Sequence, residues 1–226
     1  ISNGIVKGYA DGSFKPNNPV TRAELSKMLS VAMAVAGVQK AETDPRISTM
    51  YAAQVLIDSL PGDQDKATTE ALYERLNALN GGDNVRFIEE KEPNDSRPKA
   101  NIITLKNDGE SYFKLFGTIT SDIFDVDFFK FTLLHDSLVE ILGYWASDEV
   151  YNQGFEDDLR ICLYSARGDL VLDSDLAYSD DLDLEAFRYI QEHLTAGTYY
   201  IEVTTYGYED TYVDKYYSIN LGIFPD

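Results

Sequence analysis

The fold class is decided by the stretch Phe128-Phe129-Lys130-Phe131-Thr132-Leu133, in which apolar and polar side chains partly alternate. Such alternation is typical of a β-strand with one buried face. Runs of the same kind, with turn signals such as Ala196-Gly197 between them, occur at residues 138–142, 159–164, 170–172, 199–204 and 217–221. Many short strands separated by regular turns predict a β-sandwich or a barrel.

The character of the sequence changes near residue 85, where strand-like runs replace helix-like ones. Two helices are expected between residues 47 and 79, the first ended by Pro61-Gly62, and together they would form a helical hairpin used as a spacer. Paired glycines mark a linker at residues 80–84. The sequence therefore predicts a mainly β fold with a small α-helical N-terminal part, divided into segments 1–40, 41–84 and 85–226.

An earlier helix begins near residue 21. Thr21 and Glu24 have the spacing of a capping box, and Val20 and Leu25 stand at the positions of a hydrophobic staple. Gly37 is the expected end of this helix. One apolar stripe is predicted along it: Leu25, Met28, Leu29, Ala32, Val35 and Ala36.

The charge balance narrows the classes of function. The chain has 39 acidic and 19 basic residues and a formal net charge of −20. Nucleic-acid binding needs Lys and Arg to neutralise phosphates, so we expect no nucleic-acid partner and no attraction to anionic membranes. A negative surface instead favours solubility and the binding of cations.

Cysteine usage and hydropathy add further limits. Cys162 is the only cysteine, so no intrachain disulfide can form, and its place in a strand-like run indicates a structural thiol. No run approaches the ~20 apolar residues of a membrane-spanning helix, so we expect no membrane insertion. The chain starts at Ile1 without a signal peptide, which is expected of a mature protein or of a piece of a longer one.

Two acidic groups suggest a metal site. Glu90, Glu92 and Asn94 are two residues apart, and Pro93 biases Glu92 toward an extended conformation, so these three side chains can share one side of the chain. A second group, Asp122, Asp125 and Asp127, precedes the strand at residue 128. Hard oxygen ligands of this kind suit Ca²⁺, whereas one cysteine and two histidines argue against zinc and copper. The alternative is that Asn94-Asp95 only makes an Asx turn.

The N-terminal segment carries a specific motif. Residues 4–24 fit the pattern G-I-V-x-G-Y-x-D-G-x-F-x-P-x-x-P-x-T-R-A-E, which resembles the second half of an S-layer homology repeat, over about residues 4–36. In that family the repeats attach bacterial surface proteins to secondary cell-wall polysaccharide. The arginine of T-R-A-E is implicated in glycan contact, so the resemblance makes Arg22 a glycan-binding candidate. Capping alone accounts for Thr21 and Glu24.

A second resemblance covers about residues 88–223. The patterns E-x-E-P-N-D-S, G-x-I, D-x-D-F-F-x-F, D-L-x-x-x-L-Y and L-x-A-G-T-Y-Y-I-x-V follow in order and resemble a bacterial pre-peptidase C-terminal domain, to which the collagen-binding domains of clostridial collagenases are similar. This resemblance implies a jelly-roll-like antiparallel β-sandwich with calcium between an acidic segment and a nearby loop. The positions that match its calcium ligands are Glu90, Glu92, Asn94, Asp95 and Asp127. The second acidic group adds Asp122 and Asp125 to the predicted ligands.

The resulting hypothesis is a non-enzymatic protein, on the bacterial cell surface or secreted, with a wall-attachment segment and a calcium-binding sandwich. Its expected partners are cell-wall polysaccharide and an extracellular protein or polysaccharide ligand. The alternative is an accessory fragment of a secreted hydrolase or protease, although neither G-x-S-x-G nor H-E-x-x-H occurs in the chain. Tyrosines near the C-terminus could form a binding face, but Tyr199 and Tyr217 are expected in the core.

Overall fold

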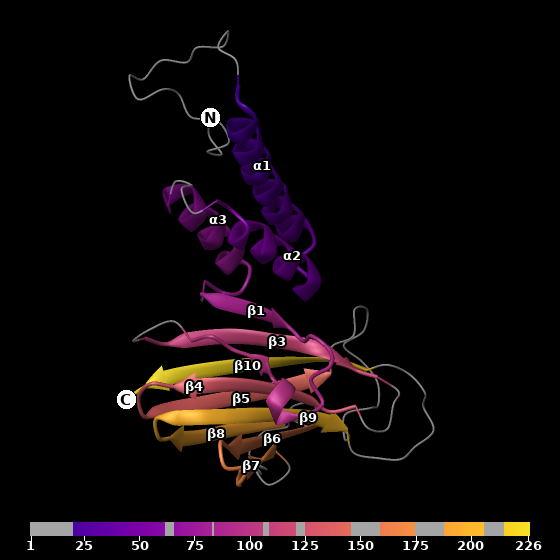
Figure 1. The fold of residues 1–226 in the computed structure, drawn as a ribbon, viewed down its shortest axis with the longest axis vertical. Helices are drawn as coiled ribbons and strands as arrows, with labels where there is room; N and C mark the ends of the chain where they lie inside the picture. Colours follow the sequence, from indigo (N-terminus) through magenta and orange to yellow (C-terminus); the bar gives the residue numbers. More distant parts are fainter. Residues whose placement is uncertain are drawn as a thin grey trace. The chain divides into compact units, whose positions relative to one another are not determined.

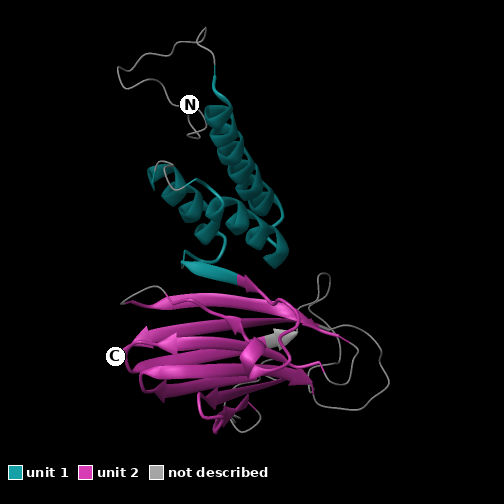
Figure 2. Ribbon diagram, in the orientation of Figure 1, with its two compact units in different colours: residues 1–87 teal, residues 88–226 magenta. Residues whose placement is uncertain are grey.

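The structure is a computed structural model. It describes residues 20–61, 66–82, 84–105, 109–120, 125–145, 159–174, 188–205 and 215–226. The chain divides into two compact units, residues 1–87 and residues 88–226 (Figure 2). The division between Phe87 and Ile88 falls inside a strand, and each unit is described by itself below.

The first unit contains three helices that pack on one another: α1 (Arg22–Thr43), α2 (Ile47–Asp58) and α3 (Lys66–Ala78) (Figure 1). Their buried side chains are small or aliphatic, which lets the helix axes approach closely. The apolar core of these three helices consists of Val31, Ala34, Val35, Val38, Ala41, Met50, Ala53, Ile57, Leu72 and Leu76.

The predicted start of α1 is confirmed. The Thr21 amide donates to Glu24 Oε2 at 2.8 Å, and the Glu24 amide donates to Thr21 Oγ1 at 3.2 Å, which completes the capping box. Val20 and Leu25 are 58% and 59% exposed, so no buried staple accompanies it. Polar capping therefore defines this helix start.

The predicted end and stripe of α1 are wrong. The helix continues past Gly37 to Thr43, and of the predicted stripe only Val35 is fully buried, whereas Leu25 and Leu29 are each 59% exposed. A Cβ on Gly37 would lie 2.7 Å from Leu56 Cδ1 and 3.4 Å from the Ala53 Cα. The glycine thus marks the close approach of α2 to α1 rather than a helix end.

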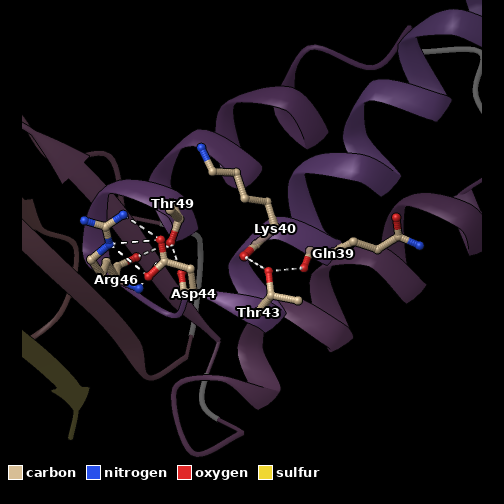
Figure 3. A network of polar contacts seen from close by, with 6 residues as sticks. All are labelled: Gln39, Lys40, Thr43, Asp44, Arg46 and Thr49. Carbon is tan, nitrogen blue, oxygen red and sulfur yellow. Dashed lines mark hydrogen bonds and ion pairs between the residues drawn. The ribbon is translucent and has the colours of Figure 1, made fainter.

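Local polar contacts shape the corner between α1 and α2 (Figure 3). Thr43 Oγ1 donates to the Lys40 carbonyl at 2.9 Å, so it satisfies an acceptor of the last turn. Arg46 Nη2 donates to Asp44 Oδ2 at 2.6 Å, and the Arg46 amide donates to Thr49 Oγ1 at 3.1 Å. The free backbone groups at both helix ends therefore find partners without a long loop.

The second unit is a mainly β sandwich of two five-stranded sheets, which confirms the predicted fold class. One sheet has the order β1-β3-β10-β5-β8 and the other β2-β4-β9-β6-β7. The pairs β3–β10, β10–β5, β5–β8, β4–β9, β9–β6 and β6–β7 are antiparallel, and the short pair β2–β4 is parallel. The bounds are β1 Val85–Glu89, β2 Asn101–Ile102, β3 Ser111–Ile119, β4 Asp127–Leu133, β5 Ser137–Trp145, β6 Leu159–Ser165, β7 Leu170–Asp173, β8 Arg188–Leu194, β9 Gly197–Thr205 and β10 Lys215–Pro225; a 3-10 helix, η1, spans Arg97–Lys99.

Alternation of side chains fills the space between the sheets, as the opening stretch predicted. In β4, Phe129 and Phe131 are at most 1% exposed, while Lys130 between them points to the other face. The prediction that Tyr199 and Tyr217 belong to the core is confirmed: the Phe131 and Tyr199 rings stack 5.8 Å apart, and Phe129 meets Tyr217 edge-on at 6.5 Å. The Phe129–Tyr217 contact joins the two sheets, because Tyr217 lies in β10 and Phe129 in β4, whereas Phe131 and Tyr199 lie on neighbouring strands of one sheet.

Cys162 is fully buried in β6, as expected for a structural thiol. Burial, and then the nearby Asp173 carboxylate, raise the pKa of its thiol to about 12. The nucleophilic thiolate is therefore suppressed at neutral pH.

Candidate metal centre

The acidic segment that follows β1 is held against the start of β4. The Asn94 amide donates to Glu92 Oε2 at 2.9 Å, and the Asn94 carbonyl accepts from the Ser96 amide at 2.8 Å and from the Phe128 amide at 3.2 Å. These bonds bring residues 90–95 beside Asp127, the residue before Phe128, although more than thirty positions separate them in sequence.

Two groups of three carboxylates form there, and they share one member. Glu90, Glu92 and Asp127 each place an oxygen within 4.8 Å of the others, and Glu92, Asp95 and Asp125 do the same. The two groups together contain five acidic side chains, with Glu92 between them. None of the five forms an ion pair with a lysine, arginine or histidine in the described ranges.

Glu90 is fixed by neighbouring strands of the sandwich. Its Oε1 accepts from the Thr118 amide at 2.6 Å, and its Oε2 accepts from the Tyr217 hydroxyl at 2.9 Å. A Cβ on Gly117 would lie 2.3 Å from the Glu90 carboxylate and 2.5 Å from the Tyr217 oxygen. Gly117 therefore leaves the space in which the Glu90 carboxylate lies.

Two polar side chains of this region are buried without partners. Asp127 is 0% exposed, and neither of its carboxylate oxygens accepts a hydrogen bond. Asn94 is also 0% exposed, and its side-chain atoms Nδ2 and Oδ1 both lack hydrogen-bond partners. Such groups are costly unless an ion or ordered water satisfies them, so a ligand at this place would account for both.

The electrostatics agree with a site that lacks its own counter-charge. Burial, and then the neighbouring Glu90 and Asp125 carboxylates, raise the pKa of Asp127 to about 9. Burial, followed by the charges of Asp125, Asp95 and Glu90, also raises the pKa of Glu92. The Tyr217 pKa is raised well above its ordinary value by burial and then by Asp127 and Glu90. A bound cation would reverse these shifts, because it stabilises the ionised carboxylates.

The donor set selects the kind of ion. Within the described residues, both groups consist of carboxylates alone, with no histidine or cysteine among them. Ca²⁺ accepts ~6–8 oxygen ligands in irregular geometry, whereas Mg²⁺ demands a near-ideal octahedron and zinc prefers nitrogen and sulfur. The residues present fit calcium best.

The predicted ligands fall into three classes. Glu90, Glu92, Asp95, Asp125 and Asp127 lie together in the two groups. Asn94 is buried beside them in the same segment, and Asp122 lies outside the described residues.

Sequence reasoning missed two supporting residues. Tyr217 was expected only to fill the core, yet its hydroxyl also fixes Glu90. Thr118 supports Glu90 through its backbone amide, which no residue-type pattern reveals. Gly117 was visible in the G-x-I pattern, but its reason, the space for Glu90, required the fold.

The glycan-binding candidate lies apart in sequence from this centre. Arg22 is exposed in the first turn of α1, directly after the Thr21 cap. Residues 4–19, which carry most of the S-layer homology motif, are outside the described residues.

A known protein family matches the N-terminal end of this chain. Residues 1–26 match the S-layer homology domain family. No curated protein matches the chain in sequence.

Several solved structures are similar in fold. The pre-peptidase C-terminal domain of collagenase from Bacillus anthracis matches with 15% identity and a TM-score of 0.38, over 58% of this chain and 99% of that one. The lysozyme inhibitor PliG of Aeromonas hydrophila matches with 11% identity and a TM-score of 0.33, over 62% and 98%. Tandem CBM51 modules of a family 98 glycoside hydrolase from Streptococcus pneumoniae match with 14% identity and a TM-score of 0.30, over 44% and 29%.

Both resemblances drawn from the sequence motifs recur among these matches. The S-layer homology match indicates association with a cell surface. Among the described helices, none combines the length and the apolar character that crossing a bilayer requires.

Proposed function

We propose that the chain is a non-enzymatic bacterial cell-surface protein whose β-sandwich binds calcium through Glu90, Glu92, Asn94, Asp95, Asp125 and Asp127. The observation that carries this proposal is the fully buried Asp127 carboxylate, which has no hydrogen-bond partner and lies within 4.8 Å of two other acids. Asp122, on the same acidic stretch, is proposed as a further ligand.

Calcium would act here as a structural ion. It would join the segment after β1 to the start of β4, because ligands from both would share one charge. Binding to the folded state alone raises the free energy of unfolding by mass action. Outside the cell, where millimolar calcium is common, such a site would be filled and the sandwich would be stabilised.

The N-terminal segment is proposed to attach the protein to secondary cell-wall polysaccharide, with Arg22 as a contact. A guanidinium presents a planar pair of donors that fits an anionic sugar substituent. Since the chain carries a net charge of −20, nonspecific attraction to an anionic polymer is not available to it. Retention on purified cell-wall sacculi should therefore fall in Arg22→Ala relative to the unaltered chain, and equal retention would remove Arg22 from the site.

The calcium proposal is tested by titration calorimetry with a neighbouring pair of variants. Glu90→Gln removes a cluster member, whereas Glu89→Gln changes an exposed acid one residue earlier that belongs to neither group. We expect Glu90→Gln to weaken calcium binding at least about tenfold, which corresponds to ~1.4 kcal/mol, and Glu89→Gln to leave it unchanged. Equal affinity of both variants, or no heat with the unaltered chain, would contradict the site.

The absence of enzymatic activity is proposed from the sequence, which holds neither of the hydrolase motifs sought in it. Peptide, ester and glycoside substrates should therefore give background rates. Turnover that a single substitution in this chain abolishes would overturn this part of the proposal.

A further inference from the structure

The outer face of the sheet β2-β4-β9-β6-β7 carries a row of side chains that the calcium site does not use. Lys130 of β4 lies directly opposite Tyr200 of β9, and Tyr200 lies directly opposite Tyr164 of β6. All three are partly exposed, whereas the residues on either side of Lys130 and Tyr200 point into the core. Directly opposite residues have Cβ atoms ~5 Å apart, so the three form a continuous strip across three strands.

A fourth residue, Arg97 of η1, completes the strip. Its guanidinium carbon lies 4.5 Å from the Tyr164 ring centre and 5.9 Å from that of Tyr200. Lys130 Nζ lies 5.9 Å from the Tyr200 ring centre. Two cations thus lie beside two tyrosine rings, and each makes a cation–π contact with at least one ring.

The turn between β6 and β7 is shaped to receive Arg97. Gly168 has φ +92, and a Cβ at this position would lie 2.3 Å from Arg97 Nη1. Arg97 Nη2 also approaches the Gly168 carbonyl at 3.5 Å. A side chain at residue 168 would therefore displace the guanidinium, and only glycine fits both the conformation and the space.

The two cations of this strip belong to no ion pair within the described part of the chain. Neither Arg97 nor Lys130 forms an ion pair with a carboxylate in the part of the chain that the structure describes. Of the acids nearby, Asp173 pairs with Arg160 at 2.6 Å. Glu202 is half-buried, and this burial raises its pKa, while the charges of Arg160 and Arg97 act in the opposite direction without an ion pair to Arg97. Two unpaired cations are conspicuous in a chain with a net charge of −20.

Further polar groups surround the strip. Lys99 of η1 and Arg167 of the β6–β7 turn are exposed neighbours of Arg97 and Gly168 in sequence. On the next row of the sheet, the Thr132 and Thr198 hydroxyls lie 3.0 Å apart and are exposed. The surface therefore offers aromatic rings, positive charge and hydroxyl groups in one place.

We propose that the strip Arg97–Tyr164–Tyr200–Lys130 binds a polysaccharide that carries carboxylate groups. The apolar C–H face of a pyranose ring packs on a tyrosine ring, and the unpaired Arg97 and Lys130 pair with the sugar carboxylates. The charge of the strip is complementary to this polymer and opposite to the net charge of the chain, so the strip is where an anionic polymer would make contact. The strip binds independently of the calcium site, because none of its residues belongs to the two acid groups.

The test is titration of the full chain with hyaluronan oligosaccharides, in buffer that contains calcium. Lys130→Gln and Arg97→Gln should each weaken binding about tenfold, and Tyr200→Ala by a similar factor, since each removes one contact of the strip. Lys114→Gln and Tyr189→Ala are matched controls on the opposite sheet, in β3 and β8, and should leave the affinity unchanged. Gly168→Ala should weaken binding like Arg97→Gln, because it displaces the same guanidinium.

The outcomes are distinct. Binding of hyaluronan that rising salt weakens, with little binding of neutral N-acetylglucosamine oligosaccharides, supports the proposal. Equal affinity of Lys130→Gln and Lys114→Gln, no binding of hyaluronan, or equal binding of the neutral sugars overturns it. Tighter binding of poly-glutamate or of a collagen-like peptide than of hyaluronan would also overturn it, since the strip would then be a protein-binding surface. Unchanged calcium affinity of Lys130→Gln separates this result from any failure of the calcium site.

Discussion

Two sets of acidic side chains, one in the helical unit and one where the chain enters the sandwich, have opposite surroundings. In the helical unit, the Glu42 carboxylate accepts hydrogen bonds from Arg75 Nε and Nη2, each at 2.8 Å, and Asp58 Oδ2 accepts one from Arg86 Nη2 at 2.9 Å. Where the chain enters the sandwich, Glu90 and Glu92 form no ion pair with a lysine, arginine or histidine among the described residues, and each lies close to other acids instead. These acids of the helical unit thus have counter-charges within the protein, whereas we propose that the acidic cluster of the sandwich takes its counter-charge from calcium in solution.

The largest expected effect is a loss of folding stability as pH rises in the absence of calcium, which calcium should prevent. The folded pKa of Asp127 is about 9, whereas an unfolded aspartate has a pKa near 3.8, so between these values the calcium-free folded state holds a proton that the unfolded state has lost. Stability without calcium should therefore fall as pH rises, by up to about 1.4 kcal/mol per pH unit.

Calcium should remove this loss, because it stabilises the ionised carboxylate and competes with the proton. The check is urea unfolding at pH 5 to 8, with chelator and with calcium. A stability in chelator that stays level or rises over this range would contradict the charge assigned to Asp127.

Gln54→Ala should produce the next largest effect, and it should act on the helical unit. The Gln54 amide nitrogen donates to the Phe87 carbonyl at 2.8 Å, and its oxygen accepts from the Phe87 amide at 2.9 Å, while Gln54 is only 5% exposed. The substitution leaves two buried backbone groups without partners, at a cost of about 2–4 kcal/mol. The free energy of unfolding should fall by this amount with calcium and with chelator alike. A loss that differs between calcium and chelator would contradict the view that calcium acts on the sandwich alone.

Gly117→Ala tests the acidic cluster of the sandwich. The added Cβ would meet the Glu90 carboxylate and the Tyr217 oxygen, so one of them has to move. We expect a loss of about 1–3 kcal/mol and, more tellingly, weaker calcium binding. Gly109→Ala is a suitable control, because a Cβ there meets no atom within 4 Å, and similar calcium affinities of the two variants would remove Gly117 from the site.

Arg75→Gln should have the smallest effect. Arg75 and Glu42 side chains are 34% and 36% exposed, so water and salt screen their attraction. Ion pairs at the surface contribute about 0–1 kcal/mol, and the loss should shrink further at high salt. A larger loss that persists at high salt would mean that this pair contributes more than a surface contact does.

The sequence predicted the sandwich better than the helices. In β4 and β9, alternation placed Phe129, Phe131 and Tyr199 correctly, because the period of a strand leaves only two faces to choose from. In α1, many apolar residues surround the helix, so the stripe led by Leu25 and Leu29 was misplaced, and only packing against α2 selects Val31, Val38 and Ala41. A helix whose apolar residues point in several directions does not reveal its buried face.

Missed strands and missed site residues have physical reasons as well. In β8 only Ile190 and Leu194 are buried, since it is the last strand of its sheet, and its sequence therefore carries a weak apolar signal. The metal ligands were recognisable because carboxylates close in sequence stand out. Tyr217 was not, because its contact with Glu90 joins residues 127 positions apart.

Thermal unfolding followed by two signals tests the central claim most directly. Trp145, the only tryptophan of the chain, lies in β5 and reports on the sandwich, while circular dichroism at helical wavelengths reports on α1 to α3. With saturating calcium, the tryptophan transition should move up by about 5–10 °C relative to chelator and the helical transition should not move, while Asp127→Asn should abolish the shift. Equal tryptophan transitions in calcium and chelator, or an unchanged shift in Asp127→Asn, would contradict the account.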